Sequence, residues 1–272
     1  MTSRTTLTTG ANSGIGLATA IELARRGFRS VGTVRSTAKA EAVANAAAAA
    51  GAEVETAILD VTDADGCAEV IERYRPYAVV NNAGYSGTGA VEDVDDEAVR
   101  AQLETMLVAP IRLARLALPH QRAAGAGRIV NISSIYGLTT TPLSGWYQAS
   151  KHALEAVSDA LRMEVAKDGI KVVLVEPGAF RTGIWEENRN DIERHAGSPY
   201  EGAYQRLLKL TRLATAAAPD PVWVARVVGH AVTARTPRAR YLVGVDAVTA
   251  AAVSRMAPTA MKDRLIRLTL GL

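Results

Sequence analysis

Short, mainly apolar runs alternate with longer amphipathic segments through most of the chain. Apolar runs of roughly four to eight residues are typical of buried strands, whereas apolar residues three or four positions apart indicate helices. The sequence predicts strands over Thr5–Thr9, Ser30–Val34, Glu53–Leu59, Ala78–Asn81, Gly127–Ser133, Lys171–Glu176 and Arg240–Val243. Strands that alternate with helices predict an α/β fold with one doubly wound, seven-stranded parallel sheet, covered by helices on both faces and joined by right-handed crossovers.

The alternating pattern loosens between Thr182 and about Thr215, after the sixth predicted strand. A long insertion at a strand end is more often a lid or binding loop than a linker, so we expect a lid over residues 183–215. The tail, Met261–Leu272, has the spacing of a short amphipathic helix. No segment rich in proline, glycine and serine divides the chain, which predicts a single domain over residues 1–272.

Composition and charge argue against several classes of protein. No apolar run approaches the ~20 residues that cross a bilayer, and Met1–Arg4 leads directly into a predicted strand, so we expect neither a membrane span nor a signal peptide. Cys67 is the single cysteine, which excludes an internal disulfide and fits a cytoplasmic setting; its spacing with Val70 and Ile71 predicts core packing. The formal net charge is +3 and no dense basic patch occurs, so no nucleic-acid partner is expected. The histidines are too scattered to predict a metal site: His120, His152, His195 and His230.

A glycine-rich turn follows the first predicted strand. Gly10, Gly14 and Gly16 lie between that strand and a helical pattern over Leu17–Arg26. Glycines allow a tight turn and a close approach of backbone to phosphate, and a helix N-terminus presents N–H groups and the positive end of its dipole. This arrangement predicts a dinucleotide pyrophosphate site, although its spacing, G-x-x-x-G-x-G, differs from the common G-x-G-x-x-G.

A tyrosine and a lysine four residues apart form the candidate catalytic pair. Tyr147 and Lys151 lie one turn apart on one face of a predicted helix. An ammonium group beside a phenol lowers the pKa of the tyrosine, which makes it a general acid or base near neutral pH. Ser134, thirteen residues upstream of Tyr147, is placed to hold a carbonyl or alcohol oxygen. These residues predict proton transfer to and from a substrate oxygen.

Arg35 stands at the end of the second predicted strand. In dinucleotide-binding folds an acidic residue there binds the ribose hydroxyls of NAD, and an arginine suits the 2′-phosphate of NADP. No acidic residue lies between Arg35 and Glu41, and Lys39 is close enough in sequence to assist. The sequence therefore predicts a preference for NADP(H), with NAD(H) as the alternative.

Five segments carry a family resemblance through their order and spacing: Thr9–Gly16, Asn81–Gly84, Asn131–Ser134, Tyr147–Lys151 and Pro177–Thr182. They resemble the motifs of the short-chain dehydrogenases/reductases, from Arg4 to about Gly244. Two further segments are similar to hydroxysteroid and retinol dehydrogenases and to related bacterial ketoreductases: Gly32–Arg35 and Glu176–Thr182. The resemblance implies a Rossmann fold, with a cofactor half over about residues 1–130 and a catalytic and substrate half over about 131–272.

The resemblance also implies roles for single residues. Ser134 orients the substrate oxygen, Tyr147 exchanges the proton, and Lys151 lowers the tyrosine pKa and holds the nicotinamide ribose. Asp60 accepts from the adenine amino group; alternatively, Asp60 or Thr62 begins the next helix. The implied cofactor-binding residues are Gly10, Asn12, Ser13, Gly14, Ile15, Gly16, Arg35, Asp60, Val61, Asn82, Ala83, Gly84, Tyr147, Lys151, Pro177, Gly178, Phe180 and Thr182.

One position departs from the family pattern. The helix before the Ser134 strand usually carries an asparagine that kinks the helix and holds a water linking the lysine to solvent, and Met106 stands there. A methionine has no amide group, so the departure predicts either a slow proton relay or a relay through a bare backbone carbonyl. The alternative interpretation is that Met106 packs in the core and the water stays.

The substrate is expected to lie under the lid. Aromatic and aliphatic lid residues favour a bulky hydrophobic ketone or alcohol, although the same residues could merely seal the lid against the body. The expected substrate-contacting residues are Ser134, Tyr136, Tyr147 and Trp185. The charged lid residues are expected to face water: Glu186, Glu187, Arg189 and Asp191.

Long predicted helices over Glu97–Leu118 and Gly145–Lys167 correspond to those that pair across a two-fold axis in the family. The resemblance therefore implies a homodimer or homotetramer, with apolar surface from Val99, Leu103, Leu113 and Leu116, unless packing within the chain uses it. The sequence favours an NADP(H)-dependent oxidoreductase acting on a carbonyl or secondary alcohol. The alternatives are a dehydratase or epimerase on the same scaffold, or a cofactor-binding regulatory protein with weak turnover.

Overall fold

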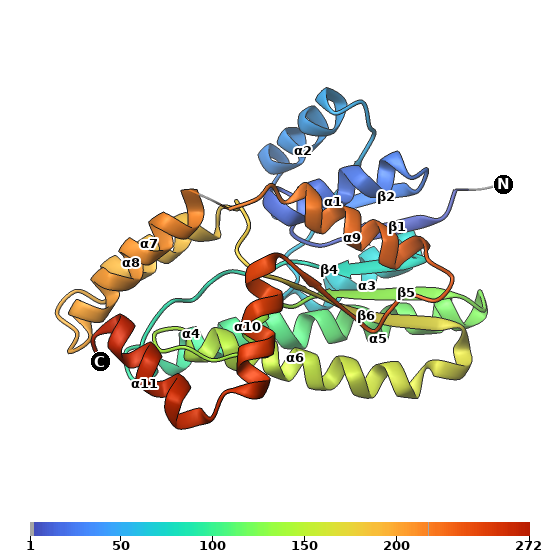
Figure 1. Ribbon diagram of the computed structural model, residues 1–272. Helices are drawn as coiled ribbons and strands as arrows, with labels where there is room; N and C mark the ends of the chain where they lie inside the picture. The colour runs from blue at the N-terminus through green and yellow to red at the C-terminus, as the bar shows by residue number, and fades with distance from the viewer. Residues whose placement is uncertain (1–2, 217) are drawn as a thin grey trace.

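The computed structural model describes residues 3–216 and 218–272, with the side chains of all these residues except 184–187 and 216. In this part of the chain, seven parallel strands form one sheet. Their order is β3-β2-β1-β4-β5-β6-β7 (Figure 1). The strands are β1 (Thr5–Thr8), β2 (Arg29–Val34), β3 (Glu55–Ile58), β4 (Ala78–Asn81), β5 (Gly127–Ile132), β6 (Ile170–Pro177) and β7 (Arg240–Val243). Each lies within two residues of its predicted bounds, and the predicted fold class is confirmed.

Helices lie on both faces of this sheet (Figure 1). They are α1 (Gly14–Arg25), α2 (Thr37–Ala49), α3 (Ala64–Tyr74), α4 (Asp96–Leu103), α5 (Ala109–Ala123), α6 (Gly145–Glu164), α7 (Ile184–Arg194), α8 (Glu201–Ala216), α9 (Val222–Thr233), α10 (Val245–Met256) and α11 (Thr259–Leu270). Since a parallel strand needs a crossover to reach its neighbour, most of these helices carry the chain back along a face of the sheet.

Successive strand residues point to opposite faces, and each face has its own core. In β4, Val79 packs into a core with Ile71 of α3 and Leu113 of α5. The next residue, Val80, packs into the opposite core with Leu23 of α1. Burial on both sides explains why β4 is almost entirely apolar in sequence.

The sequence left open whether Leu113 lies at a subunit interface or packs within the chain. Its side chain is only 1 % exposed and lies in the core beneath the sheet. It is therefore used for packing within the chain and does not contribute to the predicted subunit interface. The homo-oligomer itself stays a prediction.

The segment between β4 and β5 is not one regular helix. Between α4 and α5 the chain forms a π-helical turn, Glu104–Val108, and Met106 in this turn is buried. Single π-turns inside α-helices widen the backbone locally and are frequent at functional sites. The sequence predicted one continuous helix here.

The expected lid is helical. The chain leaves β6, forms α7 and α8, and returns through α9 to β7. The tail forms α10 and α11, and α11 packs against α8 at one end of the molecule (Figure 1). The sequence predicted α11 and missed the lid helices and α10. No helix in the described residues is long and apolar enough to span a bilayer.

Candidate active site

A cleft of about 520 Å³ opens at the carboxyl ends of the strands, where β1 and β4 lie side by side. From β1 the chain adds β2 and β3 on one side, and β4 then begins the other half of the sheet on the opposite side of β1. Ligands of open α/β sheets bind at such a switch point. Both the glycine-rich turn and Tyr147 line the cleft.

The glycine turn leaves no room for larger side chains. Gly10 has a φ of +63°, and a Cβ on it would lie 2.9 Å from the Cα of Ala83. A Cβ on Gly16 would lie 2.3 Å from the carbonyl oxygen of Gly10. Asn82 braces this turn, because its side-chain amide donates to the carbonyls of Thr9 (2.9 Å) and Gly10 (3.2 Å). The close packing fixes a shallow backbone cradle.

Helix α1 begins at this cradle without a side-chain cap. Ser13 occupies the capping position, but its side chain accepts no hydrogen bond from the helix, and the first turn contains no acidic residue. By contrast, Asp63 caps α3 and Asp95 caps α4. The N–H groups and positive dipole end of α1 are therefore available to an anion, which suits a pyrophosphate group. Neither Asp60 nor Thr62 begins the next helix, since Asp63 holds that place.

Arg35 and Asp60 lie at the adjoining part of the cleft lining. The Asp60 carboxylate accepts from the backbone N–H of Thr62 at 3.0 Å and from its hydroxyl at 2.7 Å. These hydrogen bonds, with a smaller effect from the charge of Arg35, hold the pKa of Asp60 below its usual value. The exposed guanidinium of Arg35 makes this part of the cleft positive enough to favour a phosphate.

Ser134 and Tyr147 meet at the carboxyl end of β5. Ser134 is buried, and it is joined by a hydrogen bond to Tyr147 from the start of α6. The ring of Tyr136 packs edge-on against that of Tyr147, with 6.1 Å between centroids. Burial raises the pKa of Tyr147 to about 12, against the opposing effect of Ser134. The expected depression by Lys151 is wrong for this geometry, because the loss of hydration outweighs neighbouring groups.

The side chain of Lys151 points toward the carboxyl end of β5. It is buried, its Nζ donates to the Ile132 carbonyl at 2.9 Å, and Nζ lies 5.7 Å from the Tyr147 ring centroid. Burial lowers the pKa of Lys151 to about 8, and the negative charge of Glu155 partly opposes that effect. A lysine with this pKa is still mostly charged at neutral pH and can hold an electronegative oxygen beside Tyr147.

Met106 lies close to the catalytic helix. Its sulfur is 3.9 Å from the hydroxyl oxygen of Ser150, which itself donates to the Tyr147 carbonyl at 2.7 Å. A Cβ on Gly84 would contact the Met106 methyl group at 3.4 Å. Met106 is therefore both core packing and cleft lining. A thioether is a weak acceptor and provides no amide to hold a water.

Replacing Met106 with asparagine is expected to raise kcat by about threefold, because an amide restores a donor and an acceptor beside the catalytic helix. The same change is expected to lower the melting temperature, since it buries a polar group. Steady-state kinetics and thermal unfolding measure the two effects. Met106→Leu is the control and is expected to leave kcat unchanged. An asparagine variant with the kcat of the parent would show that the relay does not depend on this side chain.

The lid is tied to the loop after β4. The Asp191 carboxylate of α7 accepts from the Ser86 hydroxyl at 3.1 Å and from the Thr88 backbone N–H at 3.0 Å. The Thr88 hydroxyl donates to Asn188 at 2.6 Å. Asp191 is only 13 % exposed, so the expectation that it faces water is wrong. Its carboxylate holds α7 over the cleft.

Nearly all the predicted site residues line the cleft. The exceptions are Gly16, which is buried behind the glycine turn, and Trp185, whose side chain lies outside the described residues. Phe180 is buried in the core and also contributes to the cleft lining. The sequence analysis missed further lining residues: Tyr85, Ser86, Thr88, Asn188 and Asp246. The position of the first three directly after Asn81–Gly84 is the one sequence signal that could have indicated them.

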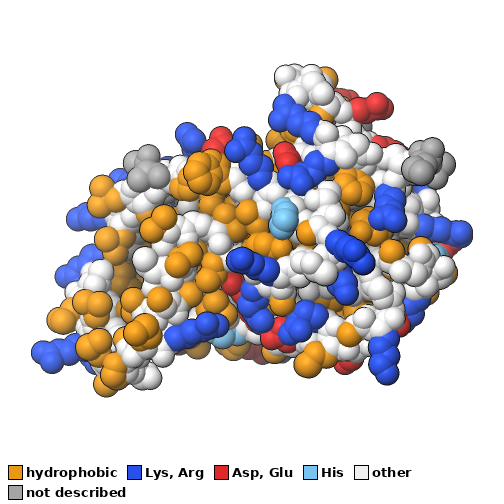
Figure 2. Space-filling model, turned by 45° about the vertical axis from the view of Figure 1, so that its right-hand side comes forward, with side chains coloured by type: hydrophobic (Ala, Val, Ile, Leu, Met, Phe, Trp, Pro, Cys, Tyr) orange, Lys and Arg blue, Asp and Glu red, His pale blue; other side chains and the backbone are white. Residues whose placement is uncertain are grey.

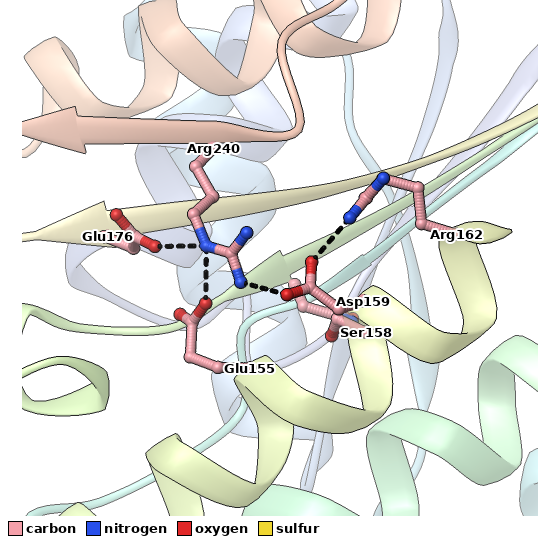
Figure 3. A network of polar contacts seen from close by, with 7 residues as sticks. Glu155, Ser158, Asp159, Arg162, Glu176 and Arg240 are labelled. Atoms are coloured by element: carbon pink, nitrogen blue, oxygen red, sulfur yellow. Dashed lines mark hydrogen bonds and ion pairs between the residues drawn. The ribbon is translucent and has the colours of Figure 1, made fainter.

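A charged network lies behind the catalytic helix (Figure 3). Nε of Arg240 is 3.1 Å from Glu155 and 3.2 Å from Glu176, and its Nη2 is 2.6 Å from Asp159. Glu155 lies one turn after Lys151 on α6, and Glu176 is fully buried near the end of β6. Burial and the charge of Glu155 raise the pKa of Glu176 to about 7. Glu176 therefore takes up a proton near neutral pH, and Arg240 lies within ion-pair distance of both Glu155 and Glu176.

Comparison with known proteins agrees with this geometry. The family model described as short chain dehydrogenase matches residues 4–193. The uncharacterized oxidoreductase YusZ of Bacillus subtilis is 35 % identical over 90 % of each chain. A 3-ketodihydrosphingosine reductase of Bacteroides thetaiotaomicron is 36 % identical over 75 % of this chain and 74 % of its own. A solved structure of an actinorhodin polyketide ketoreductase variant with NADPH aligns with a TM-score of 0.76 at 30 % identity, covering 89 % of this chain and 95 % of its own.

The chain belongs to the short-chain dehydrogenase family. It is an oxidoreductase of that family, whose members act on alcohol and ketone groups.

Proposed function

We propose that this protein reduces ketones to secondary alcohols, or catalyses the reverse oxidation, with NADP(H) as its preferred cofactor. The observation that carries the proposal is that Ser134, Tyr147 and Lys151 line the same cleft as the uncapped start of α1 and Arg35. Gly10 and Gly14 line the cleft beside the uncapped start of α1, so the residues present fit the pyrophosphate of a dinucleotide.

The chemistry divides between the cofactor and the chain. A nicotinamide dinucleotide held in this cleft supplies or accepts the hydride. Because burial raises the pKa of Tyr147 to about 12, the phenol is neutral at pH 7 and acts as the acid that donates a proton to the carbonyl oxygen. Ser134 binds that oxygen as negative charge develops on it. Lys151 holds the ribose beside Tyr147 and keeps positive charge near the reacting oxygen.

The lid supports a largely hydrophobic substrate. Ile192 of α7 and Leu207 of α8 line the cleft from the lid, and Tyr136 lines it beside Tyr147. A few polar groups lie among them, including Asn188 and Thr211. An apolar wall with few polar groups suits a bulky ketone with one reacting oxygen. The relative named for 3-ketodihydrosphingosine and the polyketide ketoreductase support this substrate class.

Changing Arg35 to aspartate is expected to weaken NADPH binding by about 100-fold and NADH binding by less than about threefold, because the charge-assisted bond to the 2′-phosphate exists only for NADPH. Fluorescence titration with each nucleotide measures both dissociation constants. Arg100→Asp is the matched control, because Arg100 is exposed on α4 and lies outside the cleft lining. An equal loss for both nucleotides would refute the 2′-phosphate role.

The direct test is a panel of hydrophobic ketones added to the NADPH-loaded protein, followed at 340 nm. Oxidation of NADPH by any of them supports the proposal, and the ketone that gives the highest kcat/KM defines the substrate class. Tight binding without oxidation across the panel would favour the second candidate, a dehydratase, epimerase or weakly active regulatory protein. Met106 in place of asparagine is the observation that keeps this second candidate under test.

A homodimer or homotetramer remains part of the proposal. Exposed apolar side chains on α6, Val157 and Met163, and Val108 at the end of the π-turn supply surface for it. Symmetric association of like helices is the common arrangement for such surfaces.

A further inference from the structure

The outer faces of α8 and α11 carry large apolar side chains that stay exposed within the part of the chain that the structure describes. On α11, Met261, Leu265 and Leu268 are 61 %, 64 % and 71 % exposed. They lie four and three residues apart, which places them along one face of the helix. The opposite face packs inward, through Leu270 and Ile266, against Tyr204 and Leu207 of α8. Helix α11 is thus apolar on both faces, and one of them is directed to solvent.

Helix α8 and the last turn of α10 extend this surface. Leu213 of α8 is 73 % exposed and Met256 of α10 is 83 % exposed. Figure 2 shows hydrophobic and basic side chains together over this end of the molecule, at left. We refer to the exposed side chains of α8, the last turn of α10 and α11 as the lid–tail surface. Contiguous exposed apolar surface of this kind marks an interaction site.

The net charge of these helices indicates the kind of partner that the lid–tail surface binds. The segments 201–216 and 245–272 hold seven Lys and Arg and three Asp and Glu, a net charge of +4, whereas the whole chain carries +3. The basic residues are Arg206, Lys209, Arg212, Arg255, Lys262, Arg264 and Arg267. The acidic residues are Glu201, Asp246 and Asp263. All of the chain's net positive charge is therefore concentrated in these helices.

A second copy of this chain is a poor partner for such a surface. A two-fold axis brings the same patch of each subunit together, so it would place one +4 region against another. Like charges facing each other across an interface cost several kcal/mol. An anionic lipid bilayer instead attracts the basic residues and buries the leucines and methionines among its headgroups and acyl chains, as it does with interfacial amphipathic helices.

We propose that the lid–tail surface binds the protein peripherally to anionic lipid bilayers, with Leu265 and Leu268 of α11 inserted at the interface. The same helix α8 supplies Leu207 and Thr211 to the cleft lining, so the bound bilayer lies against the outside of the lid. The binding itself does not depend on the proposed reaction. Only the further step, in which a lipid-dissolved ketone enters beneath α8, rests on the proposed function.

Vesicle co-sedimentation of the full chain tests the proposal. Vesicles of phosphatidylcholine with about 30 mol % phosphatidylglycerol are expected to bind the protein, and vesicles of phosphatidylcholine alone are expected to bind it at least about tenfold more weakly. The double variant Leu265→Ser, Leu268→Ser is expected to lose at least about tenfold in affinity for the anionic vesicles. Ile58→Ser is the matched control, because Ile58 is similarly exposed but lies on β3.

Light scattering of the same proteins tests the competing explanation, that the lid–tail surface is a subunit interface. The double variant is expected to keep the oligomeric state, melting temperature and NADPH affinity of the parent. Failure of the parent chain to bind anionic vesicles would overturn the proposal, as would equal binding by the double variant. Dissociation of an oligomer by the double variant would identify the surface as a subunit interface and also overturn it. Because sedimentation does not use turnover, these outcomes are independent of whether any ketone is reduced.

Discussion

Replacing Tyr147 with phenylalanine is expected to lower kcat by at least about 10³-fold while leaving the dissociation constant of NADPH within about twofold. The variant loses only the phenol oxygen, which is the proton donor in the proposed reaction. The ring stays in place, because its edge contact with Tyr136 and its position on α6 do not need the hydroxyl group. The result is read from steady-state rates with the best ketone of the panel and from nucleotide titration.

The control for this variant is Tyr136→Phe. Tyr136 lines the same cleft and contacts the ring of Tyr147, but no proton transfer is assigned to it. Its loss is expected to lower kcat by less than about tenfold. Turnover in Tyr147→Phe that matches the parent would remove the tyrosine from the mechanism. A loss of NADPH binding in the same variant would instead indicate that the phenol is needed to form the site.

Replacing Arg240 with methionine is expected to lower the free energy of unfolding by about 3 kcal/mol at pH 8, because the carboxylates of Glu155 and Glu176 are left buried without their counter-ion. Denaturant unfolding measures the loss. Arg162→Met is the control: Arg162 pairs with Asp159, where both side chains are partly exposed, and its removal is expected to cost less than about 1 kcal/mol.

The loss in Arg240→Met is expected to shrink to about 1 kcal/mol at pH 5.5. The folded-state pKa of Glu176 is raised to about 7, above its unfolded value, so the folded protein binds the extra proton as the pH falls. A protonated carboxyl no longer needs Arg240. The pKa of Asp159 is lowered, so Asp159 stays ionised at both pH values and its lost ion pair contributes equally. The same loss at both pH values would contradict the raised pKa of Glu176.

A double variant provides a second check. Adding Glu176→Gln to Arg240→Met removes one of the two uncompensated carboxylates and is expected to restore about half of the stability lost at pH 8. If no stability returns, the cost of losing Arg240 arises from its contacts with Asp159 or from packing of its stem.

Local patterns predicted the fold well for a physical reason. The inner strands, such as β4 and β5, are buried on both faces, so they contain mainly uncharged, often β-branched residues and stand out from the amphipathic helices between them. The lid was harder, because α7 contains many polar residues in a region where the alternation of strands and helices stops. Its helical state depends on being held over the cleft, which no neighbour in sequence reveals. The π-turn around Met106 also lacks a local signature.

The positions of the site residues could be predicted, whereas their electrostatics could not. Gly10, Arg35 and Tyr147 fall at strand ends or helix starts, and such places converge at one edge of the sheet. The pKa of Tyr147 depends on how much water the folded chain excludes, so the lowered pKa expected from the Tyr147–Lys151 spacing was wrong. Asp191 finds its partner, Ser86, about a hundred residues away in the chain. Arg240 likewise meets Glu155 and Glu176 only in the folded sheet.

The hydrogen bonds between the lid and the loop after β4 have a kinetic consequence. Asp191 must give up both Ser86 and Thr88 before α7 can swing away, and Asn188 must release Thr88 in the same movement. Because these hydrogen bonds link the same two segments, we expect them to break together, so that α7 is either closed over the cleft or open. We expect departure of the product of the proposed reaction to wait for this opening, which would make product release the slow step. Rapid mixing would record this as a burst of the first turnover, followed by a slower steady rate.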